Sequence, residues 1–270
     1  DSLSEPGKKQ VFTYGEGLKG MTWNETCAMW KKKYPVVQKK HWEQGEEKAA
    51  NVYAAVQAIS NRLKEGQITV VGNGSACVVG GHAQIIKKGQ RFISNSAVAS
   101  MGYDLPAAIG IWAASRKDGA YSMGAAREGE DVILVTGDGS IQMNIQELEW
   151  VKRENLPVKI MVMNNEALGM IRHLQRDYFD CLFAGTTDGC GFASCNFAEV
   201  AKAYGIPALR MLCDAVREEA PEFLEGEGPK LLEVMLEHGT FAYPKTCLGE
   251  PIHNQQPYAP KEVYDRLMEL

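Results

Sequence analysis

The sequence has no run of 18 apolar residues, and residues 1–20 contain no apolar core of the kind found in signal peptides. The first absence leaves no candidate for a membrane-spanning helix, and the second leaves no candidate for a secretion signal. We therefore expect a soluble, cytoplasmic protein with no membrane partner. The sequence begins with Asp1 and not with Met, so we expect it to be part of a longer protein.

An excess of basic residues is missing as well. The formal net charge is -5 at pH 7, and the one dense basic stretch comprises Lys31, Lys32 and Lys33, with Lys39 and Lys40 nearby. Lysines in such a stretch are usually solvated, and an acidic chain has no general attraction for nucleic acid. We therefore expect no nucleic-acid partner.

Regularly spaced cysteines are the third absence. The seven cysteines have neither the even number nor the spacing of a disulfide framework. Cys181, Cys190 and Cys195 follow His173 in the sequence, but they lack the paired CxxC spacing of structural zinc sites. We expect reduced thiols and no zinc.

Two nucleotide-binding signatures are also absent. No glycine-rich loop is followed by Gly-Lys-Ser/Thr, which excludes the phosphate-binding loop of mononucleotide-binding proteins. Gly72-Asn73-Gly74 follows an apolar segment, but Cys77 stands where a dinucleotide-binding fold has its third glycine.

From residue 46 onward, helical and extended patterns alternate. Val52, Val56, Ile59 and Leu63 recur at helical spacing, and an apolar segment follows directly. Continuous apolar runs that alternate with helices predict an α/β fold, with a doubly wound, mostly parallel sheet of about six strands and helices on both faces. Strands are expected at 68–71, 91–94, 132–136, 158–163, 208–212 and 230–236. Helices are expected at 77–87, 105–116, 141–154, 168–177, 197–204 and 215–224.

The two ends of the chain differ from this pattern. Residues 1–45 have little periodicity apart from an amphipathic helix expected at 22–34, and we interpret them as a linker. Residues 46–250 form the main domain. Residues 251–270 are polar and rich in proline before a short helix expected at 261–270, and we interpret them as a C-terminal arm.

The turn Gly137-Asp138-Gly139-Ser140 directly follows the strand expected at 132–136. Glycines let a backbone approach a ligand closely, and the free amides at a helix start favour an anion such as a diphosphate. A carboxylate at Asp138 would repel that anion unless a hard divalent cation lay between them.

Asn164-Asn165 lies about 25 residues further on, at the end of the next expected strand. If the two strands are neighbours, Asp138 and an asparagine oxygen converge on one ion, and their chemistry suits Mg²⁺. Each motif alone is ordinary turn chemistry. The pair, each half at the carboxyl end of a strand, is far more specific, and a GDG motif followed about 25 residues later by NN is the thiamin-diphosphate motif.

With these residues in view, the chain resembles the acetolactate synthase (acetohydroxyacid synthase) group of thiamin-diphosphate enzymes, in their C-terminal diphosphate-binding domain. The likeness covers about 30–260 and is densest in GDGSIQMNIQELEWVKRENLPVKIMVMNNEALGMIRHLQ (137–175) and SMGYDLPAAIGI (100–111). WKKKYP at 30–35 is similar to the end of the family's central domain, so residues 1–45 would include that end. The resemblance implies the thiamin-diphosphate-binding fold.

The resemblance also implies which residues bind the cofactor. Asp138 and Asn165 would bind Mg²⁺ through their side chains, and Ala167 through its backbone carbonyl. Met101 would support the bent conformation of the cofactor, and backbone groups of Ala99 and Met101 would bind its aminopyrimidine ring. The full set of implied cofactor-binding residues is Gly72, Asn73, Gly74, Ser75, Ala99, Met101, Gly137, Asp138, Gly139, Ser140, Met143, Asn165, Ala167, Leu168, Gly169 and Met170.

The activity implied by the family is decarboxylation of a 2-oxo acid, with pyruvate as the first candidate, and transfer of the two-carbon unit to a carbonyl acceptor. The family's activating glutamate comes from a pyrimidine-binding domain that 270 residues cannot also contain. We expect that domain in a missing N-terminal part or in another chain, and we expect a homo-oligomer. This chain alone should be inactive, and because the central domain is missing, FAD is not predicted.

Five positions, Ser75, Ala76, Ile171, His173 and Leu174, depart from the family pattern or remain open. The biosynthetic synthases carry a Trp where this chain has Leu174, which puts their preferred acceptor in doubt. Ser75-Ala76 replaces a frequent Gln-His on the substrate side, which puts the donor in doubt. Ile171, His173 and Leu174 are candidates for the substrate pocket, and the alternative for His173 is a solvent-facing or structural role.

Other functions remain open at this stage. The chain could belong to a simple 2-oxo acid decarboxylase, or it could be one subunit of a split thiamin-diphosphate enzyme. A non-enzymatic alternative is an inert structural or regulatory homologue, against which the retained Asp138 and Asn165 argue.

Overall fold

The computed structural model describes residues 21–43, 49–115, 131–212, 216, 219–239 and 241–268. The chain divides into two units, of which one comprises Lys39–Ala242 and the other comprises the flanking segments at both ends. Part of the expected linker (1–20) and the expected helix positions Arg116 and Ala215 lie outside the described residues.

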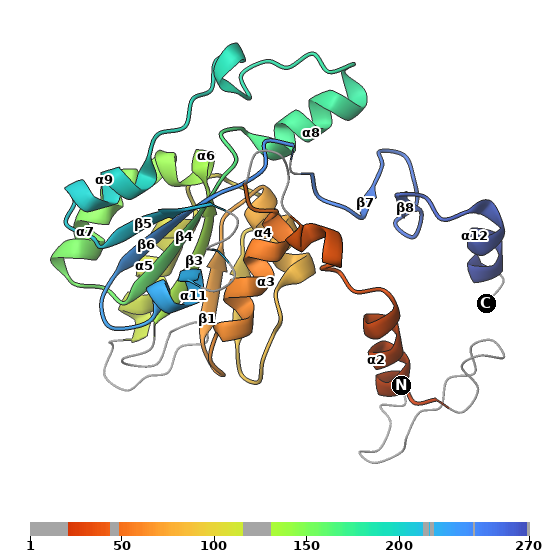
Figure 1. Ribbon diagram of the computed structural model, residues 1–270, viewed down its shortest axis with the longest axis horizontal. Coiled ribbons are helices and arrows are strands. Elements are labelled where there is room, and N and C mark those ends of the chain that lie inside the picture. The colour runs from red at the N-terminus through yellow and green to blue at the C-terminus, as the bar shows by residue number, and fades with distance from the viewer. Residues whose placement is uncertain are drawn as a thin grey trace. The chain divides into compact units, whose positions relative to one another are not determined.

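The larger unit is built on a six-stranded sheet in which every neighbouring pair is parallel. The strand order is β2-β1-β3-β4-β6-β5 (Figure 1). The expected α/β class and the parallel sheet are therefore confirmed, and each strand begins at the expected residue. The strands are β1 (Ile68–Val71), β2 (Arg91–Ser94), β3 (Val132–Gly137), β4 (Val158–Asn164), β5 (Ala208–Met211) and β6 (Lys230–Met235).

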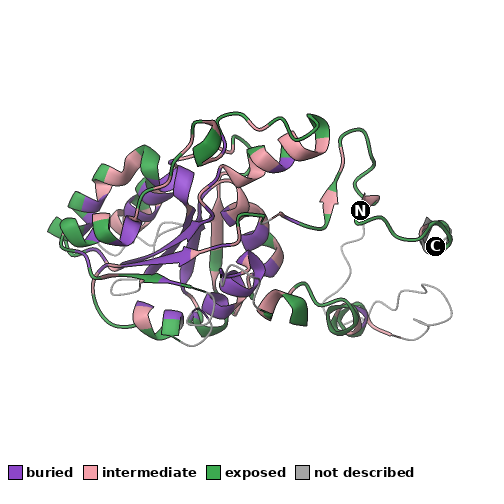
Figure 2. Cartoon of the chain, turned by 45° about the horizontal axis from the view of Figure 1, so that its top comes forward, coloured by how far each residue is buried: buried purple, intermediate pink, exposed green. Residues whose placement is uncertain are grey.

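The central strands are apolar throughout because helices cover both of their faces. Alternate residues such as Val132, Leu134, Val158 and Ile160 share one core with α5 (Asp104–Ser115), α7 (Leu148–Arg153) and α9 (Phe197–Ala203). The opposite face is covered by α3 (Val52–Arg62), α4 (Ser75–Ala83) and α11 (Glu219–Leu224). Figure 2 shows the buried residues concentrated in the sheet and on the inner sides of these helices.

The strand order reverses direction between β1 and β3. The chain leaves β1 towards β2 on one side of the sheet, whereas β3, β4 and β6 follow on the other side. Open parallel sheets bind ligands at the carboxyl ends of the strands beside such a reversal. The loop after β1 and the loop after β3 therefore flank the point at which this fold favours a ligand.

The helix expected at 141–154 is interrupted, so that prediction was wrong in part. A short α6 (Asp138–Ile141) leads into a 3₁₀ segment, η2 (Gln142–Glu147), and only then does α7 begin. Asn144 leaves the helical conformation (φ -138°, ψ 34°), and its side-chain amide donates to the carbonyl oxygen of Gly102 at 2.6 Å. That bond ties the break to the loop before α5.

The flanking unit contains isolated short elements. Helix α2 (Trp23–Lys33) begins at a capping box in which Thr22 and Glu25 bond each other's backbone, and the expected helix at 22–34 is present. The C-terminal part contains an antiparallel pair, β7 (Lys245–Thr246) and β8 (Gln255–Gln256), followed by α12 (Lys261–Met268). None of the helices in the described ranges has the length and hydropathy needed to cross a bilayer.

Candidate functional site

A pocket opens at the carboxyl ends of β3 and β4, between the loop after β1, the turn that begins α6 and the start of α8 (Gly169–Tyr178). Its empty volume is about 620 Å³ with the open mouth included. The lining residues are Asn73, Gly74, Ser75, Ala76, Met101, Gly137, Asp138, Gly139, Ser140, Met163, Asn165, Ala167, Leu168, Gly169, Met170, Ile171 and Leu236.

The polar groups of this pocket are side chains, those of Asn73, Ser75, Asp138, Ser140 and Asn165, together with the backbone groups of two helix starts. Helices α4 and α8 begin at Ser75 and Gly169, both of which line the pocket, so the free N–H groups of two first turns lie at its wall. Among the described lining residues there is no Lys, Arg or His. An anion in this pocket would therefore be bound by uncharged donors, which include backbone N–H groups and the side chains of Asn73, Ser75 and Asn165, by the dipoles of helix starts and by any cation that accompanies it.

Asp138 is the one carboxylate in the wall. It is 3% exposed, its Oδ1 accepts from the N–H of Gly139 at 2.8 Å, and its Oδ2 accepts from the N–H of Ala167 at 3.2 Å. Burial raises the pKa of Asp138 to about 7, although the backbone N–H groups act in the opposite direction. A divalent cation beside this carboxyl group would favour its ionised form.

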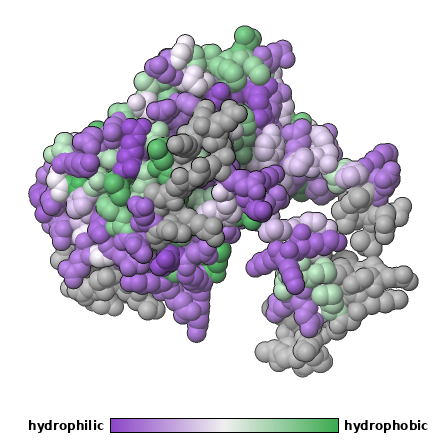
Figure 3. All heavy atoms as spheres, in the orientation of Figure 1, coloured by the Kyte–Doolittle hydropathy of each residue, from purple (hydrophilic) through white to green (hydrophobic). Residues whose placement is uncertain are grey.

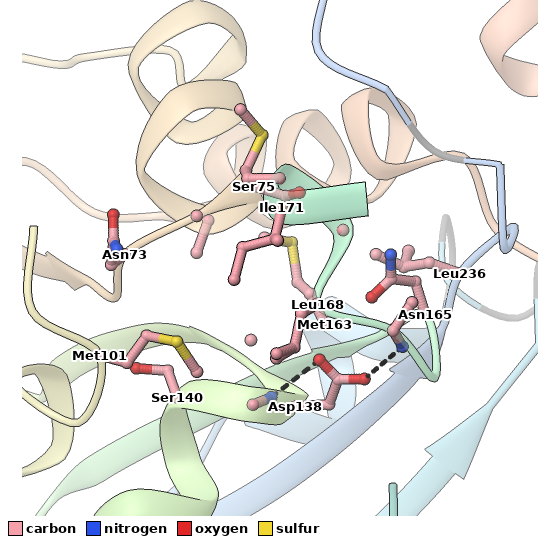
Figure 4. A pocket seen from close by; sticks show the side chains of 17 residues that line it. Asn73, Ser75, Met101, Asp138, Ser140, Met163, Asn165, Leu168, Ile171 and Leu236 are labelled. Carbon is pink, nitrogen blue, oxygen red and sulfur yellow. Dashed lines mark hydrogen bonds between the residues drawn. The ribbon is translucent and has the colours of Figure 1, made fainter. Parts of the chain in front are cut away.

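The two asparagines of the second motif have different surroundings. Asn164 is fully buried, and its amide donates to Glu233 Oε1 at 2.7 Å while its oxygen accepts from the Ser194 hydroxyl at 3.1 Å. Asn165 lines the pocket, and a side chain added at Gly169 would come within 2.7 Å of its Nδ2. Asn164 thus anchors the loop to β6, and Asn165 is the member that faces the pocket (Figure 4).

Residue 166 turns the chain directly after Asn164-Asn165. Glu166 has a positive φ of 52°, and its N–H is accepted by Asn164 Oδ1 at 2.9 Å. This turn brings the N–H of Ala167 onto Asp138. The loops after β3 and β4 are consequently joined by a direct hydrogen bond.

A second segment braces the loop from outside. Ala167 pairs with Thr187, and the N–H of Leu168 donates to the Thr186 carbonyl at 2.9 Å. The Cys190 sulfur in turn accepts from the backbone N–H groups of Thr186 and Thr187, both at 3.3 Å. The hydrogen bond from the Thr187 hydroxyl is the main reason why the pKa of Cys190 falls to about 6.

Gly139 makes a close approach of backbone to ligand possible. A Cβ atom at this position would be 2.5 Å from Leu168 Cδ2 and 2.8 Å from Met101 Cε. Both contacts lie in the pocket wall, so only hydrogen fits here without displacing the neighbours. Figure 4 shows Met101 beside Ser140, with Asn165 on the other side of Asp138.

Most of the residues expected at the site from the sequence lie together in this wall, from Asn73, Met101 and Asp138 to Asn165 and Ile171. Two others lie just behind the described lining: Gly72, which packs against Asp104, and Ala99, whose carbonyl accepts from the Asn73 side chain. Ala99 therefore contacts a lining residue directly, whereas Gly72 contacts the first residue of α5.

Three further candidates lie away from the described lining. Met143 is 58% exposed and packs near Gly102. His173 is buried on α8, its ring lies 4.7 Å from that of Phe241, and its Nε2 is 3.3 Å from Asp177 Oδ2. Leu174 is 44% exposed.

The structure adds lining residues that the sequence did not suggest. Met163 and Leu236 contribute apolar side chains from the ends of β4 and β6, and Ala76 contributes from the start of α4. Leu236 could have been predicted from the sequence, because it is the expected end of β6 and every strand of a parallel sheet ends at the same edge.

Comparison with known proteins agrees with this geometry. The family model described as "Thiamine pyrophosphate enzyme, C-terminal TPP binding domain" matches residues 72–234. Acetolactate synthase 1, chloroplastic, from Zea mays is 27% identical over 246 residues, which cover 89% of this chain and 35% of that protein. Acetolactate synthase 2, chloroplastic, from Nicotiana tabacum is 30% identical over 92% of this chain and 36% of its own length.

A bacterial relative matches a shorter stretch at higher identity. The acetolactate synthase isozyme 2 large subunit from Escherichia coli (strain K12) is 34% identical over 149 residues, which cover 55% of this chain and 24% of that protein. The chain therefore spans about a third of the length of its plant relatives and less of the bacterial one.

Proposed function

Because the chain belongs to the thiamine pyrophosphate enzymes, as an acetolactate synthase-like C-terminal TPP-binding domain, we propose that its strand-end pocket binds the diphosphate of thiamin diphosphate through a bridging Mg²⁺. The larger enzyme would decarboxylate a 2-oxo acid and transfer the two-carbon unit to a carbonyl acceptor.

The position of Asp138 is the observation that carries this proposal. Its carboxyl group is buried in the wall of a pocket that contains the starts of two helices, and no Lys, Arg or His is among the described lining residues to balance its charge. N–H donors suit an anion, whereas a carboxylate repels one. The two requirements are compatible when a divalent cation lies between the carboxylate and the anion.

The donor set fits Mg²⁺ better than a softer metal. Asp138, Asn165 and the carbonyl of Ala167 offer carboxylate, amide and backbone oxygen, the hard ligands that Mg²⁺ takes together with phosphate oxygens and water. No group of three His, Cys, Asp or Glu that could hold a metal occurs among the described residues. A zinc-type ligand set is therefore not available in that part of the chain.

The cradle also fits a diphosphate. The N–H groups at the starts of α4 and α8 line the pocket, and Gly139 leaves space where any side chain would collide with Leu168 and Met101. Asn73, Gly74 and Ser75 would hold the diphosphate from the side opposite Gly139 and Ser140.

The remaining lining residues suit the rest of the cofactor. Met101 would support its bent conformation, while Leu168, Ile171 and Leu236 would keep water away from its apolar part. Thiamin diphosphate supplies an electron sink for breaking the bond between the carbonyl and carboxylate carbons of a 2-oxo acid. Pyruvate is the first candidate for that acid.

A second domain is part of the proposal. The activating glutamate would come from a pyrimidine-binding domain, either upstream in the same protein or in another chain of a homo-oligomer. Ile171, Leu174, Phe179 and Leu182 expose apolar side chains on and just after α8, and Figure 3 shows hydrophobic atoms at the surface there. Such a surface beside a ligand site suits a protein partner. We place the enzyme in the cytoplasm and propose no FAD for this part.

Calorimetric titration with thiamin diphosphate tests the metal bridge. We predict weak binding by the 270-residue chain in excess Mg²⁺ and none in EDTA, because the bridging ion is removed. Asp138→Ala should abolish the Mg²⁺ dependence, whereas Glu149→Ala, a change at an exposed acid of α7, should leave it unchanged. Equal binding in Mg²⁺ and in EDTA by the wild type would contradict the proposal.

An activity assay separates the alternatives for the whole enzyme. The chain should be assayed together with its upstream region or a pyrimidine-binding partner, against a panel of 2-oxo acids with and without carbonyl acceptors. Product that contains both substrates supports carboligation, and release of an aldehyde alone supports a simple decarboxylase. A reconstituted enzyme that binds thiamin diphosphate and yields neither product would indicate an inert homologue.

A further inference from the structure

A carboxyl group outside the pocket joins the loops that build it. Asp104 is the first residue of α5 and is fully buried, and it is not among the described residues that line the pocket. Its Oδ1 accepts from the hydroxyl of Ser140 at 3.1 Å, and the Thr136 hydroxyl also acts on this carboxyl group as a side-chain donor, whereas its Oδ2 has no hydrogen-bond partner of good geometry in the described part of the chain. Burying an acid without a cation is costly, so this position calls for an explanation.

The first link made by Asp104 runs through Ser140. The Ser140 hydroxyl gives its hydrogen to Asp104 and accepts from the N–H of Gly102 at 2.8 Å. Asn144, at the break before α7, donates to the carbonyl of the same Gly102. The turn after β3 and the loop that carries Met101 are therefore fixed to each other through one hydroxyl group.

The second link is steric and runs to the loop after β1. A Cβ atom on Gly72 would lie 2.2 Å from Asp104 Oδ2, so the carboxyl group lies directly against the backbone at the start of that loop. The glycine is required here for space, since its φ is not in the left-handed region. Asp104 thus contacts the loop after β1 at Gly72 and accepts a hydrogen bond from Ser140 in the turn after β3. Ser140 in turn binds Gly102 in the loop that carries Met101.

We propose that Asp104 is a positioning residue for the diphosphate site: through Ser140 and Gly72 it fixes the three binding loops relative to one another before any ligand is present. This inference rests on the proposed function, because it concerns how the same pocket is held. It also assigns the role of Ser140. Since the hydroxyl hydrogen of Ser140 is committed to Asp104, Ser140 offers the ligand its backbone N–H and not its hydroxyl hydrogen.

The electrostatics agree with a role behind the wall. A second ionised carboxylate in the wall would oppose a diphosphate, and Asp104 is separated from the pocket by Ser140. Burial raises the pKa of Asp104, which favours the neutral form. A short side chain that can accept a hydrogen bond from Ser140 suits this position.

The first experiment needs no ligand. Amide hydrogen exchange should be measured at Gly102 in the metal-free chain, for the wild type, Asp104→Ala, Asp104→Asn and Ser140→Ala. We expect exchange at Gly102 to accelerate about tenfold or more in Asp104→Ala and in Ser140→Ala, because Ser140 is released or lost. Asp104→Asn should remain near the wild type, since its Oδ1 can still accept from Ser140.

The second experiment measures binding of thiamin diphosphate in saturating Mg²⁺. Asp104→Ala should weaken binding about tenfold. The double variant Asp104→Ala/Ser140→Ala should bind no more weakly than the more affected of the two single variants, because each single substitution already breaks the same linkage. The matched control is Thr69→Val, which removes a part-buried hydrogen bond that Gln84, at the end of α4, donates to buried Thr69 in β1. It should lower stability and leave the affinity unchanged.

These readouts separate two failures. If the wild type does not bind thiamin diphosphate, the proposed function fails, while exchange at Gly102 still tests the linkage. If the wild type binds and Asp104→Ala keeps wild-type affinity and wild-type exchange, the role of Asp104 is overturned. It is also overturned if Thr69→Val weakens binding as much as Asp104→Ala does. Should Asp104→Ala not fold, Asp104→Asn and Ser140→Ala carry the same comparison.

Discussion

Gly139 has space for a hydrogen atom and for nothing larger. The contacts that a methyl group would make, 2.5 Å to Leu168 Cδ2 and 2.8 Å to Met101 Cε, involve the far ends of flexible side chains. Those side chains can move aside, but their movement would change the shape of the pocket that they line.

Gly139→Ala is therefore predicted to lower the free energy of unfolding by about 1 kcal/mol and to weaken binding of thiamin diphosphate about tenfold. Gly110→Ala is the matched control, because Gly110 is an exposed position within α5 with open space around it. That change should raise the unfolding free energy by up to about 1 kcal/mol. Urea denaturation and calorimetry check both, and unaltered binding by Gly139→Ala would contradict the assigned contact.

Single residues were predictable where the chemistry was local. The turn 137–140 and Asn165 could be selected from the sequence because each follows a buried strand directly. Asp104 could not be selected, because an aspartate at a helix start is ordinary. The role of Asp104 depends on its contacts with Gly72 and Ser140. These two residues are distant in the sequence and come close to Asp104 only when β1 and β3 are paired.

At the scale of elements, β4 has a buried charge at the end opposite the pocket. Lys159 is 1% exposed, and its ammonium group donates to the carbonyls of Gly226 and Gly228, both at 2.5 Å, and lies 3.7 Å from Asp131 Oδ1. Burial lowers the pKa of this lysine. The side chain fastens the segment between α11 and β6 to the middle of the sheet.

Lys159→Met should lower the free energy of unfolding by about 3 kcal/mol, because it leaves two carbonyls and a partly buried carboxylate without their donor. Lys202→Met changes an exposed lysine that pairs with Glu199 on the surface of α9, and it should alter the stability by less than about 0.5 kcal/mol. Equal effects of the two substitutions in denaturant titrations would rule out the structural role of Lys159.

Strands were predicted more accurately than helices, and the reason is physical. Both faces of β3 and β4 are buried, so their apolar runs have abrupt ends in the sequence. The helix expected at 141–154 looked continuous because its break depends on a distant partner, the bond from Asn144 to Gly102. Local periodicity contains no information about such a bond.

At the scale of the whole molecule, raised carboxyl pKa values, those of Asp138, Asp104 and Asp131, make stability depend on pH in the metal-free chain. The pKa of Asp138 rises from 3.8 to about 7, and that of Asp104 is also raised by burial. Between pH 3.8 and about 7 the folded chain retains a proton on Asp138 that the unfolded chain loses. This group therefore makes the free energy of unfolding fall as pH rises through that window, and its effect levels off above about pH 7.

The measurement is the difference between the wild type and Asp138→Asn, with denaturant titrations in EDTA from pH 4 to pH 8. The unfolding free energy of the wild type should fall relative to that of the variant by at most about 1.4 kcal/mol per pH unit. A difference that is constant over this range would mean that Asp138 titrates normally in the folded chain.

The parallel sheet explains why the molecule binds where it does. Its order reverses between β1 and β3, and the loops after β1, β3 and β4 meet at one edge around a single carboxylate. The class of the sheet could be predicted from alternating strands and helices, but the strand order could not. That order decides that Asp138, Asn165 and Ser75 line the same cavity.

The most direct test of the account is to locate the metal. The chain should be crystallised with thiamin diphosphate and Mn²⁺, which prefers the same oxygen ligands as Mg²⁺ and scatters anomalously. We predict an anomalous peak between the Asp138 carboxylate, the Asn165 side chain and the Ala167 carbonyl, in contact with the diphosphate. A diphosphate bound in the pocket with no peak between it and Asp138 would contradict the account.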